Sequence, residues 1–428
     1  MFDRNTTRCA GIIRDALSED VVTAIGKETG FARRLRKFTP FRAAWTFLVG
    51  LASGSTNTLA DLLRLFADLS EETMAYKPFH DRLSSPGFPE FFRLLLEHLM
   101  SELVTPVYGC NKGYLAEFKV VLCQDGTSFA LNDRMADQFK GRFTSRSPAA
   151  VEVHCTYSLY QNQCVAVSVA PDAEGERDFL PDPEALENKL LLTDAGYVSY
   201  EYFDRVREAG GHVICRAKGA ASNPRIVGCY RGLPNVDTVI GKRLKEIALP
   251  RKNVDLLVEG IGRGGRRYRM RFVGVYVAKE KAHVFLFTTL SPEQFVPLRV
   301  GTLYRLRWQV ELFFKECKSY TNLQRFQTAN PRIAEGLIWA SMAAVLVRRF
   351  LLHSAFDGTG KRGAPFVAAA LSWAYVRDLG RAAMDGYRDV KRVLRRILKL
   401  LYDLARRTNP HRRDSWKDLG IEPEGAPA

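Results

Sequence analysis

The sequence predicts an α/β fold flanked by helical regions at both ends of the chain. The first 115 residues, and those after Pro331, carry apolar side chains at helical spacing. Residues 116–218 instead alternate short apolar runs with amphipathic segments, in the order β-β-β-α-β-α-β. The stretch 219–300 that follows contains strand-like runs punctuated by glycines.

The charge of the chain indicates which kind of molecule it binds. The chain has 428 residues, with 63 Lys and Arg against 47 Asp and Glu, for a formal net charge of +16. This excess favours a polyanionic partner, although a membrane surface or an RNA would also attract it. The most apolar stretch, 336–347, stops at Arg348-Arg349, so we predict no membrane span. No apolar segment follows the charged N-terminus, which argues against a secretory signal.

The eight cysteines and seven histidines are scattered along the chain, without a Cys-x-x-Cys motif. This spacing argues against a zinc site and against a Ser-His-Asp triad. Four of the cysteines fall within apolar strand-like runs, where we expect buried, reduced thiols of a cytoplasmic protein; they are Cys123, Cys155, Cys164 and Cys215.

The N-terminal region contains two short helical segments, at 58–67 and 73–83, around a break at Ser70. Ser70 is suited to cap the second segment, and Pro78 would end or kink it or lie in its first turn. Two short helices around a tight break resemble a helix-turn-helix, but any small helical bundle gives the same pattern. Both interpretations stay open.

Two strands of the central region are followed by an aspartate. The apolar run 118–123 precedes Asp125, and the run 190–193 ends at Asp194. Carboxylates at strand ends point into the crevice where α/β sheets bind ligands. Taken singly, each aspartate would more often be a turn or cap residue. Alternation through 151–159 predicts a further strand.

The stretch 219–300 is basic as well as strand-like. Strands are expected at 254–259, 268–277 and 283–289. The cations are Arg263, Arg266, Arg267, Arg269 and Arg271. They fit either a solvated sheet edge, where charge prevents edge pairing, or a hairpin that contacts DNA.

A helix predicted over 303–320 carries an unusual charge pattern. Steps of three or four residues place five side chains on one face: Tyr304, Arg307, Glu311, Lys315 and Lys318. One carboxylate thus lies among cationic and phenolic donors, which suits chemistry on a polyanion. For an isolated helix, a solvated amphipathic surface is the commoner explanation. Glu316 lies about 140° around the helix from Glu311 and should point elsewhere.

Together, Asp125, Asp194 and Glu311 supply three carboxylates without a neighbouring His or Cys. Oxygen ligands of this kind favour Mg²⁺ or Mn²⁺ over zinc. Two such ions could activate a water or a 3′-hydroxyl and stabilise the leaving oxygen. The combination with flanking cations favours this interpretation over three separate structural roles.

These residues resemble a bacterial DDE transposase of the family named after insertion sequence 4. The family's Tyr-Arg-Glu-Lys signature is matched, at its spacing, by Tyr304, Arg307, Glu311 and Lys318. The contexts LCQDGTS and LTDAGY match the first and second acidic residues, Asp125 and Asp194. The segments 29–37 and 212–218 are similar too, so that the resemblance covers nearly the whole chain.

The resemblance implies a ribonuclease H-like catalytic core, formed by 116–218 and 301–330 and interrupted by the β-rich insertion 219–300. It also implies a helical DNA-binding region at 1–115 and a basic helical region at 331–428. Between Arg377 and Arg413, 12 Lys or Arg face four Asp. A solvated helix or a surface that follows phosphates would carry such charge, and the second is favoured.

The resemblance further implies roles for single residues. Asp125, Asp194 and Glu311 would bind two Mg²⁺ or Mn²⁺ ions. The DNA backbone would be held by Tyr304, Arg307 and Lys318, with Arg216 and Lys218 as further contacts. In relatives an insertion aromatic holds a flipped base, for which the candidates here are Tyr230, Tyr268 and Tyr276.

The implied reaction is cut-and-paste transposition: a nick, a hairpin formed by the freed 3′-hydroxyl, its reopening, and joining to target DNA. The implied partners are terminal inverted repeats, target DNA and a second copy of the chain, in the bacterial cytoplasm at the nucleoid. Two alternatives stay open. One is a catalytically inactive DNA-binding relative that acts as a repressor or inhibitor. The other is a nuclease that cuts without joining.

Overall fold

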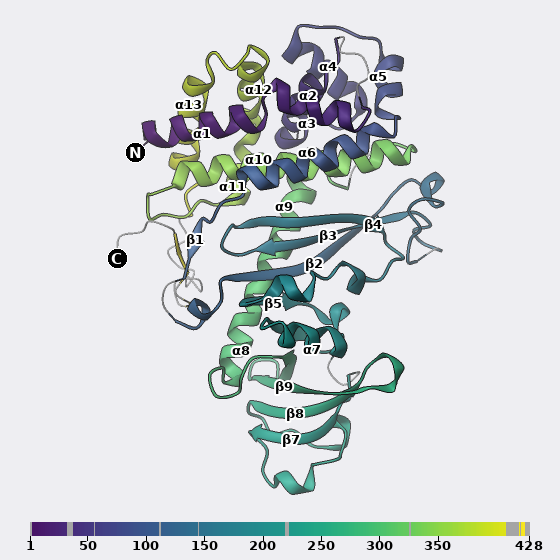
Figure 1. Cartoon of the computed structure of the whole chain (residues 1–428), viewed down its shortest axis with the longest axis vertical. Helices are drawn as coiled ribbons and strands as arrows, with labels where there is room; N and C mark the ends of the chain where they lie inside the picture. The colour runs from purple at the N-terminus through teal and green to yellow at the C-terminus, as the bar shows by residue number, and fades with distance from the viewer. Residues whose placement is uncertain are drawn as a thin grey trace.

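The structure, a computed structural model, describes residues 2–31, 37–54, 56–110, 113–143, 145–218, 222–324, 327–407, 419 and 421–423. A layer of helices from both ends of the chain lies on one face of a long mixed sheet (Figure 1). Parts of two sequence predictions, the similarity at 29–37 and the end of the basic run at Arg413, lie outside the described residues.

The N-terminal helices follow local capping signals. They are α1 (Phe2–Ala16), α2 (Glu19–Glu28), α3 (Pro40–Ser53), α4 (Leu59–Ser70), α5 (Tyr76–Leu83) and α6 (Gly87–Leu103). Thr39 caps α3 ahead of Pro40, and Thr58 forms a capping box with Asp61 at the start of α4. Pro78 lies in the first turn of α5, where its missing N–H costs nothing. Both predicted segments are therefore helices, but Ser70 is the last residue of α4 and α5 begins after Ala75 without a side-chain cap, so the predicted capping role of Ser70 is wrong.

A nine-stranded sheet runs through the molecule. Its strands are β2 (Val120–Ala130), β3 (Ala150–Ser158), β4 (Gln163–Pro171), β5 (Lys189–Thr193), β6 (His212–Arg216), β7 (Arg225–Arg231), β8 (Val254–Ile261), β9 (Arg267–Val277) and β10 (Ala282–Thr288). Their order is β4-β3-β2-β5-β6-β10-β9-β8-β7, and only β5, with its two neighbours, pairs in parallel. The strands of the predicted insertion thus extend the same sheet, as Figure 1 shows below β5.

Helices cover both faces of this sheet. On one face α7 (Tyr200–Glu208) packs Phe203 and Val206 against strand residues such as Val213. The other face packs against the helical layer, and its apolar residues share one core with both ends of the chain. A small second sheet pairs β1 (Tyr108–Gly109) with β11 (Glu422–Pro423).

The predicted continuous helix over 303–320 is wrong in one respect. The structure has α8 (Pro297–Tyr304), a 3₁₀ turn at Arg305–Arg307, and α9 (Trp308–Tyr320). The turn buries Leu306 and brings its carbonyl within 3.8 Å of the Cys123 thiol on β2. Close approach to the sheet explains the tighter winding at this point.

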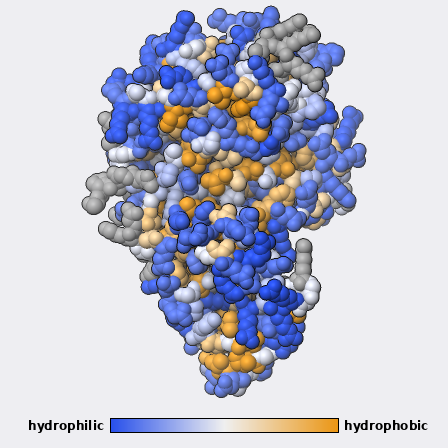
Figure 2. All heavy atoms as spheres, viewed as in Figure 1, coloured by the Kyte–Doolittle hydropathy of each residue, from blue (hydrophilic) through white to orange (hydrophobic). Residues whose placement is uncertain are grey.

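The C-terminal helices are α10 (Pro331–Phe356), α11 (Pro365–Leu371), α12 (Val376–Met384) and α13 (Val390–Leu404). Helix α10 is long and apolar enough to cross a membrane, but 94% of its most apolar window is buried inside the protein. It packs against α3, α6 and α13, as the core helix of the helical layer. The visible surface is mostly hydrophilic, with hydrophobic side chains gathered over the helical layer and where it meets the sheet (Figure 2).

The cysteine prediction is half wrong. Cys123 and Cys215 are buried free thiols, as expected. Cys155 and Cys164 instead form a disulfide between the neighbouring strands β3 and β4. The hairpin register brings their Cα atoms to 6.1 Å, within the range a disulfide spans. Sequence spacing alone did not reveal this proximity.

Candidate active site

Strand pairing brings Asp125 and Asp194 together. The last parallel pair between β2 and β5 joins Gln124 to Thr193, so the two aspartates are the next residue on each strand. Strand β2 itself continues to Ala130, paired only with β3. The prediction that a strand ends at Asp125 therefore holds for one side of β2 only. Backbone N–H groups orient both carboxylates: Gly126 donates to Asp125 at 3.0 Å, and Gly196 to Asp194 at 2.7 Å.

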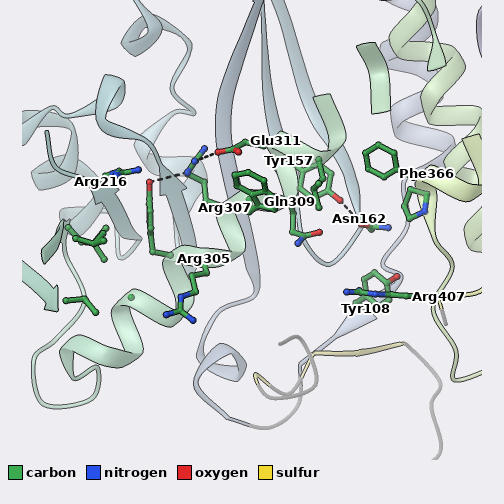
Figure 3. A pocket seen from close by; sticks show the side chains of 18 of the residues that line it. Tyr108, Tyr157, Asn162, Arg216, Arg305, Arg307, Gln309, Glu311, Phe366 and Arg407 are labelled. Carbon is green, nitrogen blue, oxygen red and sulfur yellow. Dashed lines mark hydrogen bonds and ion pairs between the residues drawn. The ribbon is translucent and has the colours of Figure 1, made fainter. Parts of the chain in front are cut away.

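Arg307 connects the strand-borne site to α9. Its Nη1 lies 2.9 Å from Asp125 Oδ2. Its Nη2 pairs with Glu311, as Figure 3 shows. Its Nε lies 3.2 Å from the Tyr304 hydroxyl. The side chain of Arg307 is 13% exposed, against 15% for Asp125 and 31% for Glu311. One guanidinium thus gathers three of the residues predicted from the sequence.

Electrostatics place all three carboxylates in one neighbourhood. Burial raises the pKa of Asp125 to about 6, the positive charge of Arg307 opposes this rise, and the charges of Asp194 and Glu311 add to it. Burial also raises the pKa of Tyr304 to about 12. Neighbouring carboxylates repel one another and so raise each other's pKa, and a cation between them favours their charged forms. Arg307 supplies that positive charge in this structure.

The donor chemistry fits a divalent metal. Three carboxylates offer only oxygen ligands, which Mg²⁺ and Mn²⁺ prefer. Among the described residues, however, no three His, Cys, Asp or Glu side chains are drawn together at ligating positions. The guanidinium of Arg307 lies between Asp125 and Glu311 instead. Holding a metal there therefore requires that Arg307 give up these two contacts.

The other predicted DNA contacts are spread around this site. Lys318 lies 3.2 Å from the Ser128 carbonyl of β2, and burial lowers its pKa. Arg216 and Lys218 are exposed at the end of β6. Lys315 points away, with its ammonium 5.9 Å from the centre of the Phe366 ring. Lys315 lies one turn after Glu311 on α9, as predicted, whereas Tyr304 and Arg307 belong to α8 and to the 3₁₀ turn.

A cavity of about 880 Å³ opens beside Arg307 and Glu311. Figure 3 shows these two residues at one end and Tyr108 with Arg407 at the other. Its lining combines aromatic, basic and aliphatic side chains. It includes residues that the sequence analysis missed: Tyr108, Arg305, Trp308, Phe366 and Arg407. Of these residues, Arg305 and Trp308 offered a local signal, since they lie next to Tyr304 and Arg307 in the chain. None of the three tyrosines proposed from the insertion, Tyr230, Tyr268 and Tyr276, is among the lining residues.

The basic insertion strand is not a sheet edge. Strand β9 lies between β10 and β8, and β7 forms the edge. Arg271 is 5% exposed and binds Asp255 through two contacts of 2.8 and 2.7 Å. Arg271 therefore supports the sheet, whereas Arg266, Arg267 and Arg269 remain exposed.

Glu316 points away from this site, as its position on the helix predicted. It is fully buried and binds Arg348 and Arg349 of α10, each at 2.7 Å. Arg349 also donates to the Tyr157 hydroxyl at 3.1 Å. The two carboxylates of α9 therefore serve two separate arginine clusters.

Comparison with known proteins supplies the family. The model of the Transposase DDE domain matches residues 116–347, just over half of the chain. A transposase for insertion sequence element IS231B from Bacillus thuringiensis subsp. berliner is 21% identical over 94% of this chain and 92% of that relative. A transposase for insertion sequence element IS421 from Escherichia coli is 31% identical over 21% of this chain and 24% of that relative.

One solved structure, of a piggyBac transposase synaptic complex with hairpin DNA, is similar with a TM-score of 0.47 and 12% identity. It covers 96% of this chain and 87% of the other. The family match spans the strands that carry Asp125 and Asp194 and the helix that carries Glu311. The chain therefore belongs to the Transposase DDE domain family and is a DNA transposase.

Proposed function

We propose that this transposase performs cut-and-paste transposition with Asp125, Asp194 and Glu311 as its metal-binding triad. The observation that carries the proposal is that Arg307 pairs with Asp125 and Glu311, while the charge of Asp194 is close enough to raise the pKa of Asp125. Arg307 and Glu311 also line the neighbouring cavity. DDE transposases depend on divalent metal ions, and we assign two Mg²⁺ or Mn²⁺ ions to this triad. Such ions would supply Lewis-acid stabilisation of charge at the reacting phosphate.

The sheet supports a more specific assignment to the insertion sequence 4 family and to a ribonuclease H-like core. An antiparallel β4-β3-β2 unit continues into the parallel strands β5 and β6, with α9 across one face. Strands β7–β10 then form the insertion between the second aspartate and Glu311. The spacing from Tyr304 to Lys318 agrees with the family signature.

The residues around the triad would position DNA. Arg307 is suited to exchange its carboxylate partners for a phosphate, since a guanidinium binds both with the same forked geometry. The Tyr304 hydroxyl lies 3.2 Å from Arg307 Nε. The Lys318 ammonium lies 3.2 Å from the Ser128 carbonyl of β2. Arg216, exposed at the cavity wall, and Lys218 would extend the contact along the backbone.

The reaction needs no covalent bond to the protein. A water oxygen attacks phosphorus, and the bridging oxygen leaves as a 3′-hydroxyl. That hydroxyl attacks the opposite strand, which closes a hairpin and releases the flanking end. A second water reopens the hairpin, and the regenerated 3′-hydroxyl attacks target DNA. The two hydrolytic steps each consume one water and leave a 5′-phosphate beside the 3′-hydroxyl, and the two attacks by a 3′-hydroxyl exchange one phosphodiester bond for another. No oxidant or nucleotide cofactor is therefore required.

We assign the remaining regions by the same logic. The helical region 1–115 would bind transposon ends, with α4 and α5 as its candidate DNA-reading pair. The region 331–428 would join two copies on synapsed DNA. Helix α13 places Leu394 and Leu401 in the core and Arg395 and Lys399 at the surface. The cytoplasm of a bacterium, at the nucleoid, is the proposed location.

The decisive experiment uses purified protein and duplexes that carry the inverted repeats flanking the gene. We expect nicks, hairpins and joined products with Mg²⁺ or Mn²⁺, and their loss in Asp125→Asn, while binding to the ends persists. Tight binding without cleavage by the wild type would favour the inactive DNA-binding alternative. Cleavage without joining would favour a nuclease, and cleavage by Asp125→Asn would contradict the assigned triad.

A further inference from the structure

The face of β2 and β3 turned away from α9 carries a buried polar layer. In the strand register His154 lies opposite Gly126, and Glu152 lies opposite Ser128. Glu152 is 5% exposed and His154 is 2% exposed. The ring of His154 stacks on Phe179, with centroids 3.8 Å apart. The segment around Phe179 therefore forms a cover over this layer, directly behind the strand that bears Asp125.

Arg142 ties this layer together. Its Nη2 lies 3.2 Å from Glu152 Oε2, and its Nη1 lies 3.3 Å from Glu176 Oε1. Its backbone N–H and its Nε hold Asp172, at 3.0 Å and 3.2 Å. One guanidinium thus joins a carboxylate of β3 to a carboxylate of the covering segment. The side chain of Arg142 is 42% exposed, whereas that of Glu152 is 7% exposed.

The two carboxylates lie against the backbone beside the two aspartates. A Cβ added at Gly126, one residue after Asp125, would collide with the Glu152 carboxylate. A Cβ added at Gly196, two residues after Asp194, would collide with the Glu176 carboxylate. Both glycines also donate their N–H groups to the neighbouring aspartate. Glu152 and Glu176 therefore pack against the two glycines that orient the Asp125 and Asp194 carboxylates.

We propose that Arg142, Glu152 and Glu176 form a clamp that sets the separation of the Asp125 and Asp194 carboxylates. This inference rests on the proposed function, because the clamp has a role in the reaction only if the two aspartates bind metal. Groups behind metal ligands orient them, and their loss typically costs about 10- to 100-fold in metal affinity or activity. The clamp members are positioning residues, since none of them contacts the reacting atoms.

Arg142→Met tests the clamp, because it removes the bridge from a partly exposed position. Three quantities are measured on the full-length protein: single-turnover cleavage of end duplexes, affinity for those duplexes in Ca²⁺, and the rise in Tm caused by Mn²⁺ alone. We expect cleavage to fall about 10- to 100-fold and the Mn²⁺-induced rise in Tm to shrink, with end affinity within about twofold of wild type. Arg142→Lys should recover only part of the loss, since an ammonium lacks the forked geometry.

Two controls make the outcomes distinct. Arg134→Met removes an exposed cation from the same connection between β2 and β3 and should change none of the three quantities. Asp125→Asn tests the triad itself, so inactive wild type or active Asp125→Asn would count against the proposed function, not the clamp. Wild-type cleavage and Mn²⁺ response in Arg142→Met would overturn the clamp. A parallel loss of end affinity would overturn it too, because Arg142 would then be a DNA contact.

Discussion

Helix α9 carries two glutamates, five residues apart, and each is bound by arginine. Glu316 and its partners Arg348 and Arg349 are between 0% and 4% exposed. Glu311 is 31% exposed and its partner Arg307 is 13% exposed, and both line the cavity of about 880 Å³. Arg349 also borders this cavity, but its side chain is only 4% exposed and Glu316 does not reach the cavity. The residue types are the same in both clusters. Access to solvent is what differs between them.

Access decides which cluster can exchange partners. Buried charges depend on their countercharge, with hydrogen bonds to fixed neutral groups as support, so removal of one partner leaves the other charge uncompensated. The pairs of Glu316 are of this kind and fix α9 to α10. Around Glu311 a phosphate or a cation can enter from the cavity and replace an ion-pair partner. The comparison teaches that burial, more than residue type, separates a structural ion pair from one available for chemistry.

The largest effect is expected from a change in the accessible cluster of Glu311, Arg307 and Asp125. Glu311→Gln should lower the single-turnover cleavage rate by about 10³-fold, equivalent to about 4 kcal/mol of transition-state stabilisation. The free energy of unfolding should change by less than about 1 kcal/mol, because the side chain is partly exposed and Arg307 keeps Asp125. Cleavage assays beside urea denaturation check both quantities. Retained cleavage would remove Glu311 from the triad.

The matched change at Glu316, in the buried cluster with Arg348 and Arg349, should lower stability and leave cleavage by the folded protein intact. Glu316→Gln leaves two buried guanidinium groups without a countercharge, which should lower the free energy of unfolding by about 3–5 kcal/mol. Protein that remains folded should still bind DNA ends and cleave them. Urea denaturation gives the stability, and cleavage is normalised to the folded fraction. If stability is unchanged while cleavage is lost, the division between the two clusters is wrong.

A smaller effect separates the charge of Arg307 from its shape. Arg307→Lys keeps the charge but loses the forked contact with Asp125 and Glu311, and should lower cleavage by about 10- to 100-fold, or about 1.4–2.7 kcal/mol. The dependence of end affinity on salt should not change. Arg307→Met, the control, should lower the slope of log Kd against log salt by about one phosphate contact. Equal slopes in both variants would argue against a phosphate contact.

The smallest effect concerns His154, in the polar layer behind Asp125. Burial, assisted by the charge of Arg142, lowers the pKa of His154 to about 4. The unfolded chain then takes up the proton first, so the stability due to neutral His154 is complete above about pH 6.5 and lost as pH falls toward 4. Relative to His154→Gln, the wild type should lose up to about 1.4 kcal/mol per pH unit in that window.

Urea denaturation at pH 7, 6 and 5 measures this difference. Burial raises the pKa of Glu152 to about 7, which gives an opposite trend with pH. Its carboxylate lies 3.8 Å from the His154 ring, so the same measurements on Glu152→Gln and on the double variant separate the two contributions. His80→Gln, in the N-terminal helix α5, serves as the control. A difference that does not vary with pH would show that His154 carries a proton in the folded protein as readily as in the unfolded chain.

Sequence by itself determined the elements and much of their chemistry. Period-two alternation marked β3, apolar residues at helical spacing marked α4, and the same spacing turned Glu316 away from Glu311. These features depend on neighbours within a few residues, so local periodicity is enough to read them. The same locality placed Asp125 and Asp194 directly after apolar strand segments.

The tertiary structure decided everything that joins distant segments. Sequence alone did not show that Arg307 would hold Asp125, 182 residues away, nor that Phe366 and Tyr108 would line the same cavity. It did not show that Arg271 is buried while its neighbours are exposed, or that Arg142 lies behind the aspartates. Each depends on strand order and on the packing of helices against the sheet, which arise from long-range contacts that no local pattern encodes.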